Sequence, residues 1–289
     1  MKILVTGASG FIGKSLINQL SKKHFVIGLF NNNEIKSKNR NVKLFRANLL
    51  KVIQIKDLDI DVIVHCANYT PANHKKSIFL KKKNNKIMTN ILKFAVRRDI
   101  SKIIYFSSIG IYKIKNKSTI SEKSKVDLTD HYSISKIQDE KIIKKWTKKN
   151  KDRKLLIIRT PGVVGFGAHG NFISNLFKKI KSTKLIDLKI HNLNLKFNNI
   201  IHIKTVGIFL IRYLNNFKKK ILILNLASSK PIKIKSIVDI AAKYFKKKIK
   251  LIDKGEDGRS FKINFDLAQK HNFKSLSVKK CITRYLKEI

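Results

Sequence analysis

The chain has 289 residues, enough for one large α/β unit with a smaller lobe, and 64 Lys+Arg against 18 Asp+Glu give a formal net charge of +46. Such an excess of positive charge is typical of nucleic-acid or membrane binding. However, only nine of the basic residues are arginines, and the lysines are spread along the chain. This distribution favours a solvated lysine surface over a nucleic-acid site. Two cysteines exclude a disulfide-dense scaffold, and no run approaches the roughly 18 apolar residues of a membrane span, so we expect a soluble cytoplasmic protein with no membrane partner.

A short apolar segment opens the chain, and a glycine-rich loop and apolar residues at helical spacing follow it, which predicts strand, loop and helix. Segments with the length and composition of buried strands are Ile3 to Val5, Phe25 to Phe30, Val42 to Phe45, Val62 to His65, Ile103 to Phe106 and Leu155 to Ile158. The intervening segments are long enough for helices. This alternation predicts an α/β fold with a doubly wound, Rossmann-like parallel sheet.

The regular alternation weakens after about Gly165. Helical patterns at Phe172 to Ile180 and Ile234 to Phe245 lie on either side of a polar, Asn-rich stretch, His191 to Asn199. We therefore predict a first domain over residues 1–165 and a smaller C-terminal substrate-binding lobe, residues 166–289, with some of its segments returning to the sheet.

Gly7, Gly10 and Gly13 form a G-x-x-G-x-x-G loop between the first strand and the first helix. Glycines permit a tight turn and a close backbone approach, and the N-terminus of a helix offers free N–H groups to a pyrophosphate. The loop predicts a site for a dinucleotide cofactor, NAD or NADP. A purely structural turn is the alternative.

The end of the second strand, where the adenosine ribose is usually recognised, carries Phe30 and Asn31. Neither supplies the carboxylate that takes the 2′-hydroxyl of NAD, and Lys36, Lys38 and Arg40 follow a few residues later. This pattern favours NADP over NAD, unless the basic residues are ordinary solvated charges.

Tyr132 and Lys136 are four residues apart, so they share one face of a helix predicted over residues 132–148. A tyrosine titrates at about pH 10. A neighbouring ammonium, together with the positive charge of an oxidised nicotinamide, would favour its phenolate and bring the pKa toward the working range. Ser107 and Ser108 end the fifth strand, at the sheet edge where ligands of such folds bind. The Y-x-x-x-K spacing also arises by chance in a lysine-rich chain, and strand-end serines also cap turns.

Six motifs occur in order: TGASGFIG (6–13), DVIVHCAN (61–68), FSSIGIY (106–112), YSISK (132–136), RTPGVVG (159–165) and NIIHIKTV (199–206). With them the chain resembles the extended short-chain dehydrogenase/reductase superfamily, and within it the NAD(P)-dependent nucleotide-sugar epimerase/dehydratase family. The resemblance implies that Tyr132 is the general acid/base, Lys136 its partner and Ser108 the substrate-hydroxyl contact. It also implies cofactor contacts from Phe11, Ile12, Asn48, Leu49, Cys66, Ala67, Asn84 and Pro161. Asn171 is implied to contact the nucleotide-sugar.

The chain departs from the family's pattern at positions that bear on the substrate. Asn48 replaces the usual Asp, and Gly162 replaces an Asn. Asn198 stands where an Arg is usual, and Lys204 where an Asp is usual. Ile109 and Gly110 follow Ser108. The 4,6-dehydratases of the family carry an Asp-Glu pair at these two positions, and the epimerase-reductases have a cysteine at the position of Gly110. The resemblance therefore disfavours both dehydration and combined epimerisation and reduction.

The resemblance then leaves hydride transfer at one carbinol or keto carbon of a nucleotide-sugar, most often C4. We expect a 4-ketoreductase or a 4-epimerase that serves polysaccharide biosynthesis, contains no metal and forms a homodimer through helices over about residues 84–97 and 132–148. An RNA-binding member of the fold, or a non-catalytic cofactor-sensing one, is the alternative.

Overall fold

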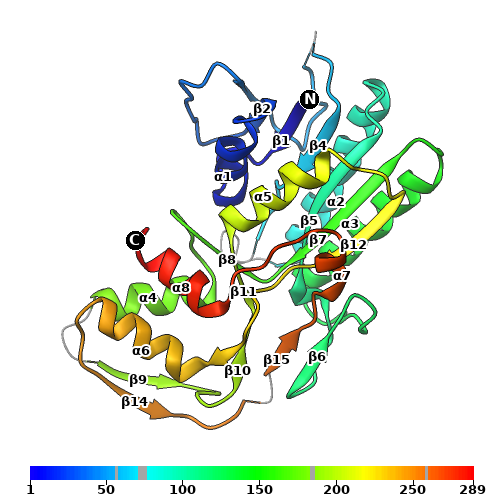
Figure 1. The fold of residues 1–289 in the computed structure, drawn as a ribbon. Helices are drawn as coiled ribbons and strands as arrows, with labels where there is room; N and C mark the ends of the chain where they lie inside the picture. The colour runs from blue at the N-terminus through cyan, green and yellow to red at the C-terminus, as the bar shows by residue number, and fades with distance from the viewer. Residues whose placement is uncertain (56–57, 71–76, 183–185, 258–259) are drawn as a thin grey trace. The chain divides into compact units, whose positions relative to one another are not determined.

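The computed structural model describes residues 1–55, 58–70, 77–182, 186–257 and 260–289 (Figure 1). The chain divides into two compact units that interleave along the sequence. The sheet unit comprises Met1–Ile111, Val126–Arg159 and Gly207–Leu224, and the lobe unit comprises Tyr112–Lys125, Thr160–Val206 and Asn225–Ile289. Among the described residues, no helix combines the length and apolar character that crossing a membrane requires.

Seven strands form the central sheet in the order β12-β7-β5-β4-β1-β2-β3. Their bounds are β1 (Lys2–Thr6), β2 (Phe25–Phe30), β3 (Val42–Arg46), β4 (Val62–His65), β5 (Lys102–Ser108), β7 (Lys154–Thr160) and β12 (Ile221–Asn225). The registers from β5 to β3 are all parallel. The predicted Rossmann-like parallel sheet is confirmed, with each of its six predicted strands in place. The seventh strand, β12, was missed.

The helices of the sheet unit explain why the central strands are so apolar. They are α1 (Phe11–Leu20), α2 (Ser77–Arg97) and α3 (His131–Lys148), together with the greater part of α5 (Ile203–Leu214). All four residues of β4 are buried, as expected for a strand covered on both faces. The helices α2 and α3 lie side by side (Figure 1) and share one apolar cluster with the sheet, which includes Met88, Phe94 and Trp146.

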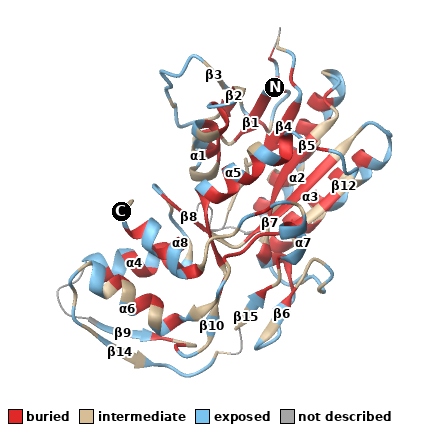
Figure 2. Cartoon of the chain, viewed as in Figure 1, coloured by how far each residue is buried: buried red, intermediate tan, exposed pale blue. Residues whose placement is uncertain are grey.

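The lobe unit is built from short strand pairs and helices, three of which pack around a separate core. Its elements are β6 (Ser118–Ile120), β8 (Gly162–Val164), α4 (Phe172–Ser182), β9 (Ile186–Ile190), β10 (Lys196–Phe197), β11 (Ile200–His202), β13 (Ile232–Lys233), α6 (Ile234–Tyr244), β14 (Ile249–Asp253), β15 (Phe261–Ile263), α7 (Asp266–Lys270) and α8 (Val278–Leu286). Figure 2 shows that α4, α6 and α8 each bury one side. Phe177 stacks on Tyr285 within this core, with ring centroids 5.7 Å apart. The two helices predicted here, α4 and α6, are confirmed.

Candidate active site

The glycine loop between β1 and α1 has a backbone that only glycine fits at two positions. Gly7 has φ +71°, and its backbone lies against that of Ala67, where a Cβ would come within 2.9 Å. A Cβ on Gly13 would lie 2.2 Å from the carbonyl oxygen of Gly7. Gly10 precedes α1, and no side chain caps the helix there, so the first N–H groups of the helix remain available. This cradle fits a dinucleotide pyrophosphate, with Phe11 and Ile12 in the first turn of α1.

A cavity of about 530 Å³ extends from the glycine loop along the ends of β2, β3 and β4. It brings together seven of the residues that the sequence predicted for the cofactor: Gly7, Gly10, Asn31, Asn48, Leu49, Cys66 and Ala67. Sequence reasoning missed other lining residues, among them Asn68, Tyr69 and Lys83. The cavity could hold the adenosine half of a dinucleotide.

Arg46, on the strand beside β2, is a residue at the predicted ribose site that sequence reasoning missed. Phe30 pairs with Arg46 in the register of β2 and β3, and Arg46 Nε donates a hydrogen bond to the carbonyl oxygen of Asn31 at 3.2 Å. The Arg46 side chain is exposed, so the rest of its guanidinium is open to a ligand. The pairing of β2 with β3 could have revealed this neighbour, but the register cannot be read from sequence.

Tyr132 lies in the first turn of α3, which begins after the N-cap Asp130. The Asp130 carboxylate accepts hydrogen bonds from the backbone N–H groups of Tyr132 and Ser133, at 2.9 and 3.0 Å. Burial raises the pKa of Tyr132 to about 12, and side-chain hydrogen bonding with Ser108 at the end of β5 opposes this rise. Burial is thus the largest influence on this pKa in the chain. The expected joint effect of the Lys136 ammonium and an oxidised nicotinamide stays a prediction.

Lys136 is 4% exposed, one turn further along α3. Its Nζ donates a 2.7 Å hydrogen bond to the carbonyl oxygen of Phe106 on β5, and it lies 5.9 Å from the ring centroid of Tyr132. Burial lowers the pKa of Lys136 to about 8. The structure thus brings the three predicted catalytic residues, Ser108, Tyr132 and Lys136, together at the carboxyl end of β5.

The turn after β5, which is a single 3-10 turn over Ile109–Ile111, is packed directly against α3. Ser133 Oγ donates to the carbonyl oxygen of Gly110 at 2.8 Å, while Gly110 N–H donates to Ser108 Oγ at 3.0 Å. Ile109 is buried, and the turn contains no acidic residue. The positions beside Ser108 are thus occupied by apolar packing and backbone contacts.

Asn84, a predicted cofactor contact on α2, is 1% exposed. Its Nδ2 donates to Ser135 Oγ at 3.0 Å and to the carbonyl oxygen of Tyr69 at 3.1 Å, while its Oδ1 accepts from Tyr69 N–H at 2.8 Å. Both ends of the amide are therefore used to connect α2, α3 and the segment after β4. This contact fixes the helix that carries Tyr132 relative to the end of the sheet.

The two remaining predicted residues, Pro161 and Asn171, belong to the lobe unit. Asn171 immediately precedes α4: its Oδ1 accepts a hydrogen bond from Ser174 N–H at 2.9 Å, and its Nδ2 donates to the carbonyl oxygen of Val163 at 3.0 Å. It also lines a cavity of about 540 Å³ within this unit, together with Lys189, Lys196, His191 and Asn199. Pro161 stands between β7 and β8.

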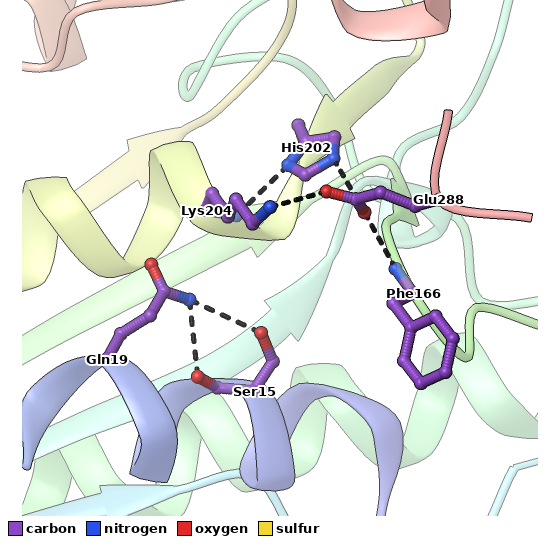
Figure 3. A network of polar contacts seen from close by, with 6 residues as sticks. All are labelled: Ser15, Gln19, Phe166, His202, Lys204 and Glu288. Carbon is purple, nitrogen blue, oxygen red and sulfur yellow. Dashed lines mark hydrogen bonds and ion pairs between the residues drawn. The ribbon is translucent and has the colours of Figure 1, made fainter. Parts of the chain in front are cut away.

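Two of the departures from the family pattern have structural partners in the lobe unit. Asn198 is buried and pairs with the backbone of Ile263 through both atoms of its amide, each at 2.9 Å. Lys204 Nζ lies 2.6 Å from Glu288 Oε1, and His202 Nε2 lies 3.2 Å from Glu288 Oε2. Figure 3 shows both side chains directed at the Glu288 carboxylate. Burial lowers the pKa of His202 to about 4, so it is neutral at pH 7. Asn198 therefore fixes the segment before β11 to β15, and Lys204 forms an ion pair near the end of the chain.

Comparisons with known proteins agree with this arrangement. The model of the family described as "NAD dependent epimerase/dehydratase family" matches residues 3–218. The GDP-6-deoxy-D-talose 4-dehydrogenase of Aggregatibacter actinomycetemcomitans is 32% identical over 208 residues, which are 65% of this chain and 63% of that protein. An N-acetyl-alpha-D-glucosaminyl-diphospho-ditrans,octacis-undecaprenol 4-epimerase of Escherichia coli O157:H7 is 28% identical over 64% of this chain and 55% of its own length. The chain thus matches less than two thirds of either relative.

Solved structures show the same fold. The UDP-glucuronic acid 4-epimerase of Bacillus cereus, in complex with NAD, superposes with a TM-score of 0.82 at 20% identity, over 100% of this chain and 96% of that one. RMD from Pseudomonas aeruginosa, complexed with NADPH, gives a TM-score of 0.80 at 18% identity, over 99% and 98%. One of these neighbours is bound to NAD and the other to NADPH.

Proposed function

We propose that this chain, which belongs to the NAD dependent epimerase/dehydratase family, reduces a 4-keto nucleotide-sugar with NADPH. The observation that carries this proposal is the cluster of Ser108, Tyr132 and Lys136 at the end of β5, with an acid-free turn beside it. A 4,6-elimination would need a carboxylate in that turn to move a proton. The name of the relative from A. actinomycetemcomitans, a 4-dehydrogenase, also supports redox chemistry at C4.

In this proposal the residues of the chain handle the proton and the oxygen of the sugar. The bound nicotinamide supplies the hydride. Ser108 hydrogen-bonds the keto oxygen, and Tyr132 donates a proton to it as the alkoxide forms. A Tyr132 pKa of about 12 keeps the phenol protonated at pH 7, which suits proton donation in reduction better than proton removal in oxidation. The ammonium of Lys136 stabilises the phenolate that remains.

The proposal is tested by supplying purified protein with NDP-4-keto-hexoses and NADPH, and with NDP-hexoses and NAD, and by following nicotinamide absorbance and sugar products. Net oxidation of NADPH with a 4-ketone supports the reductase. Interconversion of C4 epimers without net change in cofactor would identify the epimerase instead. If no nucleotide-sugar reacts under either condition, the proposal is wrong.

Arg46 gives the preference for NADP a specific reader. Its guanidinium is held beside Asn31 by one hydrogen bond, and the remaining N–H groups can take the 2′-phosphate of NADP. Arg46→Met is expected to reduce kcat/KM for NADPH by about 10-fold or more, since one charge-assisted contact is lost, and to leave kcat/KM for NADH unchanged. Arg212→Met, which removes an exposed arginine of α5, is the matched control. An equal loss with both cofactors would contradict this assignment.

The cavity of the lobe unit supports binding of the nucleoside diphosphate. Lys189 and Lys196 line it, and Asp257 is the one acid among the described lining residues. The double variant Lys189→Gln, Lys196→Gln is expected to raise KM for the nucleotide-sugar about 10-fold and to leave kcat unchanged, because the diphosphate charge is the same in the ground and transition states. Lys250→Gln, on β14 outside the cavity, is the control. A changed kcat with constant KM would argue against this role.

A further inference from the structure

A buried carboxylate lies on α3 three residues after Lys136, and the proposed mechanism does not use it. Asp139 is 1% exposed. Its Oδ2 accepts a 3.0 Å hydrogen bond from Tyr105 Oη on β5. Its Oδ1 has no hydrogen-bond partner among the described residues. Burying a half-satisfied carboxylate is costly, so its presence beside a buried lysine needs a physical reason.

Tyr105 connects this carboxylate to the lysine. Lys136 Nζ lies 4.8 Å from the centroid of the Tyr105 ring, and its hydrogen bond goes to the carbonyl oxygen of the next residue, Phe106. One side chain of β5 therefore contacts the ammonium with its ring face and the carboxylate with its hydroxyl. No carboxylate lies within ion-pair distance of Lys136 in the described part of the chain, so Asp139 acts on the ammonium across the tyrosine rather than by direct contact.

The other acids of α3 are engaged elsewhere. Glu140 is bound by Arg159 through two hydrogen bonds of 2.9 and 2.6 Å, and by Lys144 at 3.3 Å. Asp130 is occupied at the helix N-terminus by backbone N–H groups. Glu140 also opposes the fall in the pKa of Lys136, but less than Asp139 does.

The groups that face Lys136 from the sheet carry no negative charge at neutral pH. Burial, with Lys136 as the second cause, lowers the pKa of His65 to about 3, so this imidazole is neutral. Burial raises the pKa of the Cys66 thiol and that of the Tyr105 phenol, which therefore keep their protons. Burial raises the pKa of Asp139 to about 6, which leaves it ionised at pH 7, and its charge in turn opposes the fall in the pKa of Lys136.

We propose that Asp139 is the buried counter-charge that keeps Lys136 protonated, and that Tyr105 is the positioning residue that holds Asp139 beside it. The arrangement allows an ammonium to be almost fully buried without losing its proton. The proposal rests on the proposed function only in giving Lys136 a role in the reaction; the charge pairing is a property of the folded chain.

The direct test follows the protonation of Lys136 by NMR in protein labelled with ¹³C at lysine Cε. The signal of a buried lysine should titrate at a lower pH than the signals of the exposed lysines. It is assigned to Lys136 by its absence from the spectrum of Lys136→Met. In the wild type we expect a midpoint near pH 8. Asp139→Asn keeps the acceptor for Tyr105 but removes the charge, and is expected to lower the midpoint by about one pH unit or more. Asp152→Asn, which removes an exposed charge after α3, should leave it unchanged. An unchanged midpoint in folded Asp139→Asn would overturn the proposal.

A second variant keeps the test available if Asp139→Asn does not fold. Tyr105→Phe retains the ring beneath Lys136 and removes the hydrogen bond that lowers the pKa of Asp139. In aspartate labelled with ¹³C at Cγ, the Asp139 midpoint is therefore expected to rise above about 6. A midpoint that does not move would contradict the positioning role of Tyr105.

An activity readout separates this proposal from the proposed function. In Asp139→Asn the alkaline limb of the kcat profile for reduction should move to lower pH together with the NMR midpoint of Lys136, with KM little changed. If no nucleotide-sugar is reduced, the proposed function fails while the NMR titrations still decide the charge pairing. If reduction occurs but neither titration moves, only the counter-charge proposal fails.

Discussion

Tyr132→Phe is expected to lower kcat by about 10²- to 10⁴-fold, because the variant keeps the ring but has no proton to give to the sugar oxygen. Ser108, the other hydroxyl at this site, hydrogen-bonds with Tyr132 and is placed to orient the oxygen, not to protonate it. Cofactor affinity should change little, since the glycine loop and the cavity beside it are untouched. Steady-state rates and a fluorescence titration with NADPH measure the two effects separately.

Tyr244→Phe, at an exposed position on α6 in the lobe unit, makes the same chemical change far along the chain from the proposed site and should retain full turnover. Retention of turnover by Tyr132→Phe itself would exclude this residue as the proton donor. A fall in both variants would point to instability instead, which a thermal unfolding measurement would reveal.

Gly13→Ala is expected to abolish detectable binding of NADPH. The new Cβ would lie 2.2 Å from the carbonyl oxygen of Gly7 and 2.8 Å from its carbonyl carbon, so the backbone that forms the cradle must move. Forcing a group into such a space costs about 1–3 kcal/mol of stability in addition to the loss of binding. Fluorescence titration with NADPH and chemical denaturation measure the two losses.

Gly255→Ala supplies the control for strain alone. Gly255 has φ +74° in the lobe unit and open space around its Cβ position, so alanine there costs only the left-handed backbone, about 1–2 kcal/mol. It should bind NADPH like the wild type. If Gly13→Ala also bound NADPH normally, the glycine loop would not be the pyrophosphate cradle.

The strands predicted with their exact bounds are uniformly apolar, because the sheet is covered on both faces there. β2 and β4 have the predicted bounds for this reason. β12 has the same apolar character, ILILN, but it follows three lysines after the sequence has lost its regular alternation. Several strand pairs of the lobe unit, such as β10 with β13, are only two or three residues long, and their partners lie far away in the chain.

For the candidate site, sequence could predict the residues whose chemistry depends on local spacing. The glycine loop and the Tyr132–Lys136 pair are of this kind, and the structure adds Ser108 to the pair as expected. Arg46 and Tyr105 could not be found this way, because they act through neighbours on an adjacent strand or helix. Asp139 carries no signal in the sequence, since an acid in a helix normally indicates a solvated face, and only its burial marks it.

Reduction of a 4-keto nucleotide-sugar by NADPH is tested most directly by tracing hydride from labelled NADPH into the sugar. Protein is incubated with 4-deuterated NADPH of each face and an NDP-4-keto-hexose, and the product is analysed by NMR and mass spectrometry. In the wild type we expect one deuterium at C4 of a single epimer with one of the two labelled cofactors and none with the other, and in Tyr132→Phe we expect little labelled product in the same time. Deuterium at another carbon, or a product that lacks deuterium with both labelled cofactors, would exclude hydride transfer from NADPH to C4.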